Sequence, residues 1–262
     1  METLPHRSAG WMAAVLLWLL SWSLILSGCA TTPSAIDAGG DGRRVGVLSL
    51  LGDQLQVAGV GEVGRSHTFV DIGAWRIDRH VEQYARRIIR SRGRAEVVDI
   101  NMDREVSKRL YTDCDGNCDT RAPTVRVEAL RTSLSRWRRD KGLDHLVLFV
   151  RSDNRQALLG PLVTSTAGVG LGLIPGSVAV GRSTTVFAYV QAIVIEAETG
   201  QVLATTGFFN NGFVDAEVPV PAAGHWPAAG GAVIAQAIRR QLESGVDVAL
   251  EQLGLLEPVA AR

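Results

Sequence analysis

The clearest β-hairpin pattern in the chain is TVFAYVQAIVIEAETGQVLATTGFF (residues 185–209). Its first half alternates two sets of mostly apolar side chains up to Glu196, and an apolar run returns after Glu198-Thr199-Gly200. Two such runs joined by a short turn that contains Gly predict a β-hairpin. Because both sets of side chains are apolar, we expect the hairpin to lie in or near the centre of the sheet.

The segments around this hairpin predict further strands and helices. Short apolar runs predict strands at 44–51, 55–60, 68–72, 95–100 and 145–150. Apolar residues at helical spacing predict helices over 77–92, about 125–141 and 232–253. This order predicts an α/β fold, with α+β as the alternative, in which a mixed sheet with a long hairpin is flanked by about three helices.

The helix predicted over 77–92 has a basic polar face. The residues on that face are Arg79, Glu82, Arg86, Arg87 and Arg90. Arginines near the end of a helix are favoured by the helix dipole. We interpret this face as solvated, and a patch that binds phosphate or lipopolysaccharide is the alternative.

The N-terminal region predicts export and a lipid anchor. An apolar run from about Trp11 to Leu26 is shorter than the roughly 20 residues of a membrane-spanning helix, and it ends at Leu26-Ser27-Gly28-Cys29. This tetrapeptide resembles the lipobox of bacterial lipoproteins. The resemblance implies removal of residues 1–28 and a diacylglyceryl thioether and an acylated amine on Cys29, with palmitate as an acyl group. Because Ala30 follows, it also implies retention at the outer membrane. An ordinary signal peptide or an inner-membrane signal anchor is the alternative.

The remaining chain predicts one domain on a tether. Residues 29–43 are small, polar and Gly-rich, which is typical of a flexible linker. Residues 44–257 then form a single periplasmic α/β domain with an apolar, Gly-rich insertion at 156–181. The chain has 27 basic and 27 acidic residues and a net charge of zero, so charge gives no case for a nucleic-acid partner.

Two cysteines remain for an oxidising compartment. Gly116 lies between Cys114 and Cys118, and a turn there brings the two close enough for a disulfide. Oxygen-bearing side chains alternate here as in the first half of a calcium loop, but the Gly and Glu that complete such a loop are missing. These side chains belong to Asp113, Asp115, Asn117 and Asp119. We predict a disulfide and no metal site; unreacted thiols, and a metal or redox role, are the alternatives.

The segment 156–181 has no charged residue and is interrupted by Gly and Pro. Exposed apolar area usually marks a contact surface. We therefore predict that it contacts a protein partner, and a buried irregular loop or contact with the bilayer are the alternatives. The predicted contact residues are Leu158, Leu159, Leu162, Val169, Leu171, Leu173 and Ile174.

No motif in the chain indicates catalysis. The sequence has no Gly-x-Ser-x-Gly elbow and no HExxH, and the glycines at 168–172 lack the Lys-Ser/Thr of a phosphate loop. The histidines that follow the leader are scattered, at His67, His80, His145 and His225. We predict no catalytic residue and no cofactor.

A second resemblance concerns architecture. The hairpin VIEAETGQVL (194–203), after a short first strand and two basic-faced helices, is similar to periplasmic lipoprotein domains of the curli secretion channel family and to the N-terminal domain of the Tol–Pal β-propeller protein. In the channel family, insertions become membrane hairpins of an oligomeric pore. Residues 156–181 lack the apolar/polar alternation of a transmembrane strand, and no functional residue is transferred.

These observations predict a non-enzymatic binding or assembly module in the cell envelope. It faces the periplasm at the outer membrane, is held by lipid on Cys29, and binds an envelope protein. One alternative is an oligomeric subunit of an outer-membrane secretion or pore complex. Another is a small-molecule binder or hydrolase whose site the sequence does not reveal.

Overall fold

A computed structural model describes residues 42–61, 64–102, 126–152, 169–175, 183–214, 226 and 228–257. Within these residues the predicted α/β fold is confirmed, because one eight-stranded mixed sheet is flanked by three α-helices. The strands are β1 (Arg44–Leu50), β2 (Gln54–Gly61), β3 (Gly64–Asp71), β4 (Glu96–Val98), β5 (His145–Arg151), β6 (Leu171–Ile174), β7 (Thr184–Glu196) and β8 (Val202–Val214). The helices are α2 (Ile77–Arg92), α4 (Arg131–Lys141) and α5 (Ala228–Gln252), with short 3-10 turns η2 (Gly73–Trp75) and η3 (Val127–Leu130).

The β7–β8 hairpin is the longest pairing in the sheet. The two strands are antiparallel from Thr184 opposite Val214 to Ile195 opposite Val202. On its other edge β7 pairs with both β5 and β6. The prediction of a hairpin is therefore confirmed, and β7 lies inside the sheet as expected. The expected central position is wrong for β8, which among the described strands pairs only with β7.

The strands β5 and β6 are two halves of one interrupted strand beside β7. β5 pairs with 190–196 of β7, and β6 pairs with 185–188. At the junction Ser152 donates its N–H to Tyr189 O (3.0 Å), and Gly170 donates its N–H to Ser152 O (2.9 Å). Both β5 and β6 are antiparallel to β7, so the two segments run in the same direction beside it.

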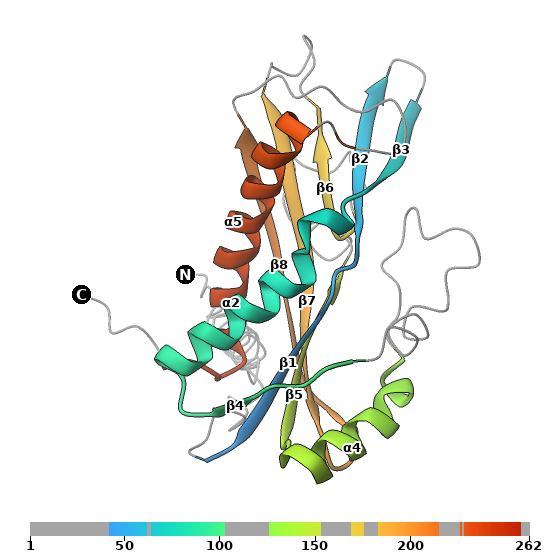
Figure 1. Cartoon of the computed structure of the whole chain (residues 1–262). Helices are drawn as coiled ribbons and strands as arrows, with labels where there is room; N and C mark the ends of the chain where they lie inside the picture. Colours follow the sequence, from blue (N-terminus) through green and yellow to red (C-terminus); the bar gives the residue numbers. More distant parts are fainter. Residues whose placement is uncertain are drawn as a thin grey trace, which may run out of the picture. The chain divides into compact units, whose positions relative to one another are not determined.

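β1 and β2 form a second interrupted strand next to the first. β1 is parallel to β5, β2 is parallel to β6, and the break between them is at Leu51–Asp53 (Figure 1). β4 pairs with the start of β1, and β3 pairs along β2. The break at Leu51–Asp53 positions the candidate site described below.

Helices cover both faces of the sheet, because strand residues alternate between two apolar layers. Val147 and Phe149 of β5 pack in the layer under α2 and α5, whereas Leu146 and Leu148 pack in the layer under η3 and α4 (Figure 1). All four of these side chains are fully buried. The second layer also contains Leu130, Leu134 and Trp137 from η3 and α4, which lie where the sequence predicts a helix at 125–141.

The expected contact surface in 156–181 needs a correction. Leu171 and Leu173 are only 1% and 0% exposed, because β6 lies between β2 and β7 inside the sheet, and Val169, which precedes β6, is 4% exposed. These three side chains therefore belong to the core and do not form a contact surface. Ile174 is partly exposed at the end of β6. Leu158, Leu159 and Leu162 lie outside the described residues.

Gly172 shows why a central strand of this sheet contains glycine. A Cβ at this position would lie 2.0 Å from Phe187 Cζ and 2.6 Å from Gln56 O. Only a residue without a side chain allows Phe187 to lie over the strand. The glycine that suggested an irregular loop is here a requirement of close packing within a strand.

Candidate functional site

One edge of β1 lacks a strand partner for most of its length. β4 pairs only with Arg44–Gly46, and beyond this point no described strand covers the edge. Backbone groups that are partly buried need hydrogen-bond partners. The groups concerned belong to Val47, Ser49 and Leu51.

Side chains of α2 take the place of the missing strand. Arg86 Nη2 donates to Val47 O (3.1 Å), and Ser49 donates its N–H to Glu82 Oε1 (3.1 Å). Arg86 Nη2 also donates to Glu82 Oε2 (3.2 Å), which links the two charges. Residues four apart on a helix lie on one side of it, so this pair can follow the strand edge.

Asp78, one turn earlier on α2, binds the break between β1 and β2. Its Oδ1 accepts from Ser49 Oγ (2.7 Å) and from the Leu51 N–H (2.6 Å), and its Oδ2 accepts from the Gly52 N–H (3.0 Å). Gly52 has φ +75°, a conformation that glycine adopts without strain. Arg151 donates from Nε to Leu51 O on the other side of the break.

Burial dominates the protonation of both carboxyl groups. Burial raises the pKa of Asp78, and the hydrogen bonds from Ser49, Leu51 and Gly52 oppose this rise only in part. Burial also raises the pKa of Glu82, against the Ser49 N–H and the charge of Arg86. Asp78, Glu82 and Arg86 form a row along α2. They supply the hydrogen-bond partners for the backbone groups at the edge of β1, although charged groups are costly to bury.

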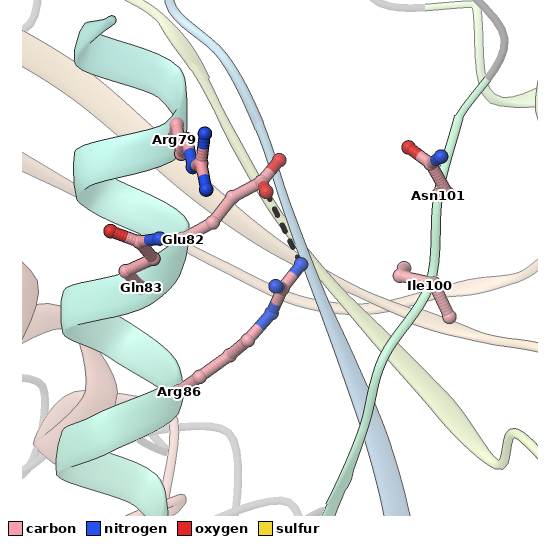
Figure 2. Close-up of a pocket in the computed structure, with 6 residues that line it drawn as sticks. All are labelled: Arg79, Glu82, Gln83, Arg86, Ile100 and Asn101. Carbon is pink, nitrogen blue, oxygen red and sulfur yellow. Dashed lines mark hydrogen bonds and ion pairs between the residues drawn. The ribbon is translucent and has the colours of Figure 1, made fainter.

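Glu82 and Arg86 of this row line a cavity of about 630 Å³ between α2 and the segment that follows β4. Four of its lining residues come from α2, and two come from the facing segment (Figure 2). They are Arg79, Glu82, Gln83, Arg86, Ile100 and Asn101. The volume is in the range of small-molecule sites, roughly 300–1,000 Å³, and the lining offers cations and amides.

The expectation of a solvated basic face on this helix is wrong for two residues. The side chains of Glu82 and Arg86 are only 19% and 16% exposed, since both reach under the helix to β1. Arg79, Arg87 and Arg90 are exposed, as expected. The four-residue spacing of Asp78, Glu82 and Arg86 was the available signal, but the sequence does not show which strand edge needs it.

The histidines show no shared site. His80 lies on α2 with its Nε2 3.0 Å from Glu243 Oε1 of α5; its pKa is lowered chiefly by burial, and Glu243 opposes this. His145 is buried at the start of β5. His67 is in β3, and His225 lies outside the described residues. In the described ranges no three His, Cys, Asp or Glu side chains form a metal-binding group.

Other predicted sites are not in the described part of the chain. Cys29 precedes residue 42, and Cys114 and Cys118 fall in the undescribed range 103–125. The same range contains Asp113, Asp115, Asn117 and Asp119. The lipid anchor and the disulfide therefore stay predictions. Within the described helices, none is long and apolar enough to cross a membrane.

The outer edge of β8 is a second candidate surface. Among the described strands β8 pairs only with β7, and its 13 residues, VLATTGFFNNGFV, carry no charge and no proline. Phe213 is 77% exposed. Phe209 contacts Tyr189 of β7 with ring centroids 5.7 Å apart. This edge therefore combines backbone groups of an edge strand with exposed apolar area.

Comparisons with known proteins give only remote likenesses. No family model matches the chain, and no curated protein matches it. Solved structures that resemble it include a PelC dodecamer from Paraburkholderia phytofirmans, with TM-score 0.33 and 12% identity over 81% of this chain and 87% of that one. Protein XCC0632 from Xanthomonas campestris, of family DUF330, gives 0.39 and 9% over 85% and 91%.

The C-terminal domain of LpoB from Salmonella enterica gives a TM-score of 0.25 and 11% identity over 72% of this chain and 90% of that one. All three TM-scores are below 0.5, so these likenesses carry no argument about this chain.

Replacing Asp78 by alanine should destabilise the fold by about 3 kcal/mol, because it leaves the Ser49 hydroxyl and the N–H groups of Leu51 and Gly52 without an acceptor. Chemical denaturation of the purified chain measures this loss. Asp140→Ala, which removes an exposed carboxylate paired with Arg139, is the control and should change the free energy of unfolding by less than about 0.5 kcal/mol. Equal effects of the two substitutions would contradict the role of Asp78.

The raised pKa of Glu82 predicts a pH-dependent effect of Glu82→Gln. The folded state holds the proton more tightly than the unfolded state, so wild type loses stability as pH rises from the unfolded pKa through the higher folded pKa. Glutamine does not titrate. The free energy of unfolding of Glu82→Gln minus that of wild type should therefore increase with pH and level off above the folded pKa.

Denaturation curves collected from pH 4 to 8 test this expectation. Glu128→Gln, at an exposed position in η3, corrects for the general effect of removing one negative charge. A difference between Glu82→Gln and wild type that stays constant or falls with pH would show that burial does not disfavour the charged form of Glu82.

Proposed function

We propose that this chain is a lipid-anchored, non-enzymatic module on the periplasmic face of the outer membrane, and that it binds an envelope protein through the outer edge of β8. One observation carries the choice of surface. Over 13 residues β8 presents an uncharged edge with no described partner strand, and Phe213 is 77% exposed at its end.

An edge of this kind is a binding element because its backbone can pair with another strand. Proteins usually protect such edges with lysine, proline or very short strands, and β8 has none of these. An extended segment of a partner that adds to the edge gains backbone hydrogen bonds. Phe213 adds an aromatic anchor, the type of side chain that often dominates binding energy at interfaces.

The lipid anchor supports the same function. Leu26-Ser27-Gly28-Cys29 predicts acylation of Cys29, and the Gly-rich residues 30–42 give the domain reach from the bilayer. Two or three acyl chains bind a bilayer far more stably than one. Confinement at one surface raises the local concentration of domain and partner, so even a small interface can be occupied.

The anchor is tested by Cys29→Ser. We expect wild type to lack residues 1–28, to carry acyl mass on Cys29 and to fractionate with outer membranes, because the thiol is the attachment point. The variant should carry no acyl mass and should be released or left unprocessed. Intact-mass analysis and membrane fractionation measure this. Retention of residues 1–28 by both forms in the inner membrane would overturn the outer-membrane assignment.

The binding surface is tested with a photo-crosslinking residue at the exposed Asn211 of β8 in the membrane-anchored chain. We expect one discrete adduct with an envelope protein, reduced about tenfold by Phe213→Lys because a charge and the loss of the aromatic ring weaken strand addition. Val248→Lys is the matched control, since Val248 is 46% exposed on α5, and it should leave the adduct unchanged.

Other results of the crosslinking experiment are also decisive. An adduct with twice the mass of the chain would support the alternative of an oligomeric subunit. Adducts that are insensitive to Phe213→Lys, or equally sensitive to Val248→Lys, would contradict β8 as the contact surface.

A further inference from the structure

The cavity beside α2 contains polar groups that the fold itself does not use. Arg79, Gln83 and Asn101 make no hydrogen bond or ion pair with any residue that the structure describes, although all three line the cavity. Arg86 is fully engaged at Nη2, yet its Nε is buried and has no hydrogen-bond partner among the described atoms. Donors are therefore left over on both sides of the cavity.

Glu82, the acidic residue in the lining, does not accept hydrogen bonds from Arg79, Gln83 or Asn101. One oxygen of Glu82 accepts from the Ser49 N–H at 3.1 Å, and the other accepts from Arg86 Nη2 at 3.2 Å. With Arg86 compensating Glu82, the charge that remains in the lining is that of Arg79. Nearby, Asp99 Oδ1 lies 3.6 Å from Arg86 Nη1 and 3.7 Å from Arg90 Nη2, so Asp99 is engaged by the neighbouring arginines.

The geometry points to a site for a small oxyanion, a molecule that bears a carboxylate or a phosphate. Arg79 is the principal ligand, because a guanidinium binds two oxygens of such a group at once. Gln83 of α2 and Asn101 of the facing segment supply amide donors from the lining. Arg86, whose charge is paired with Glu82, lies in the same lining and has a buried Nε without a hydrogen-bond partner among the described atoms (Figure 2).

This site is separate from the proposed partner surface. β8 lies at one edge of the sheet, whereas the cavity borders the opposite side, where β4 leaves β1. Loss of one activity therefore does not entail loss of the other. A ligand in this cavity would contact both α2 and the segment after β4, so binding should also stabilise that segment.

The test is calorimetric titration of the full mature chain in detergent, at low ionic strength, with two probes. Pyrophosphate represents phosphate groups, and citrate represents carboxylates. We expect saturable one-to-one binding of at least one probe, weakened about tenfold or more by Arg79→Gln, because a charged hydrogen-bond donor is lost. Added salt should weaken binding as well, since the site is partly open to solvent.

Two further variants make the result specific. Gln83→Glu adds a negative charge to the lining without removing an arginine and should also weaken binding about tenfold. Arg87→Gln removes an exposed arginine of the same helix that lies over the Tyr84 ring and outside the cavity, and it should leave affinity unchanged. Thermal unfolding of each variant checks that it is folded.

The outcomes of the titration distinguish a phosphate ligand from a carboxylate ligand, and they also show whether the site exists. Binding of pyrophosphate alone assigns a phosphate ligand, and binding of citrate alone assigns a carboxylate. Absence of binding for both probes, or equal losses for Arg79→Gln and Arg87→Gln, would overturn the site. Phe213→Lys should bind either probe as wild type does, so a failed titration would leave the β8 surface unaffected.

Discussion

The carboxylate of Asp78 accepts the hydrogen bonds that stabilise the break between β1 and β2. β1 and β2 continue one another only if the chain can turn at Leu51–Asp53 without leaving backbone N–H groups unsatisfied, and Asp78 accepts from both Leu51 and Gly52. Because β1 pairs with β5 and β2 with β6, the same break aligns two halves of the sheet. A single side chain from a helix thus supports pairings on both sides of the break.

The hydrogen bonds between α2 and the edge of β1 connect the stability of the fold with the proposed binding of an oxyanion. Burial disfavours the charged forms of Asp78 and Glu82, but hydrogen bonds from β1 require these oxygens as acceptors. Arg86 compensates Glu82 and is thereby held rigidly at the wall of the cavity. A cation positioned in this way loses little side-chain entropy when it meets an anion. The hydrogen bonds that Glu82 and Arg86 make to β1 therefore also fix the position of Arg86 in one wall of the proposed oxyanion site.

The free edge of β1 and the outer edge of β8 differ in whether side chains cover them. Beside β1 the side chains of α2 occupy the strand edge, which prevents another strand from adding there. Along β8 no described element pairs with the outer edge, and its residues carry no charge. Among the described strands β3 also pairs on one side only, but it carries Arg65 and Asp71, so the uncharged edge of β8 is the one on which the proposed strand addition rests.

Local apolar periodicity in the sequence is enough to predict the helix at 77–92, the hairpin, most strands and the mixed α/β class, because it encodes which faces are buried. The sequence also contains Leu26-Ser27-Gly28-Cys29, whose resemblance to a lipobox predicts the anchor. Only the tertiary structure decided that Leu171 and Leu173 lie in a central strand and that Glu82 and Arg86 bind β1. Both outcomes depend on partners that are distant in the sequence. An uncharged four-residue strand cannot be told from a loop by its own residues, and a charged helix face cannot be told from a solvated one. In each case the neighbouring strand decides which of the two forms.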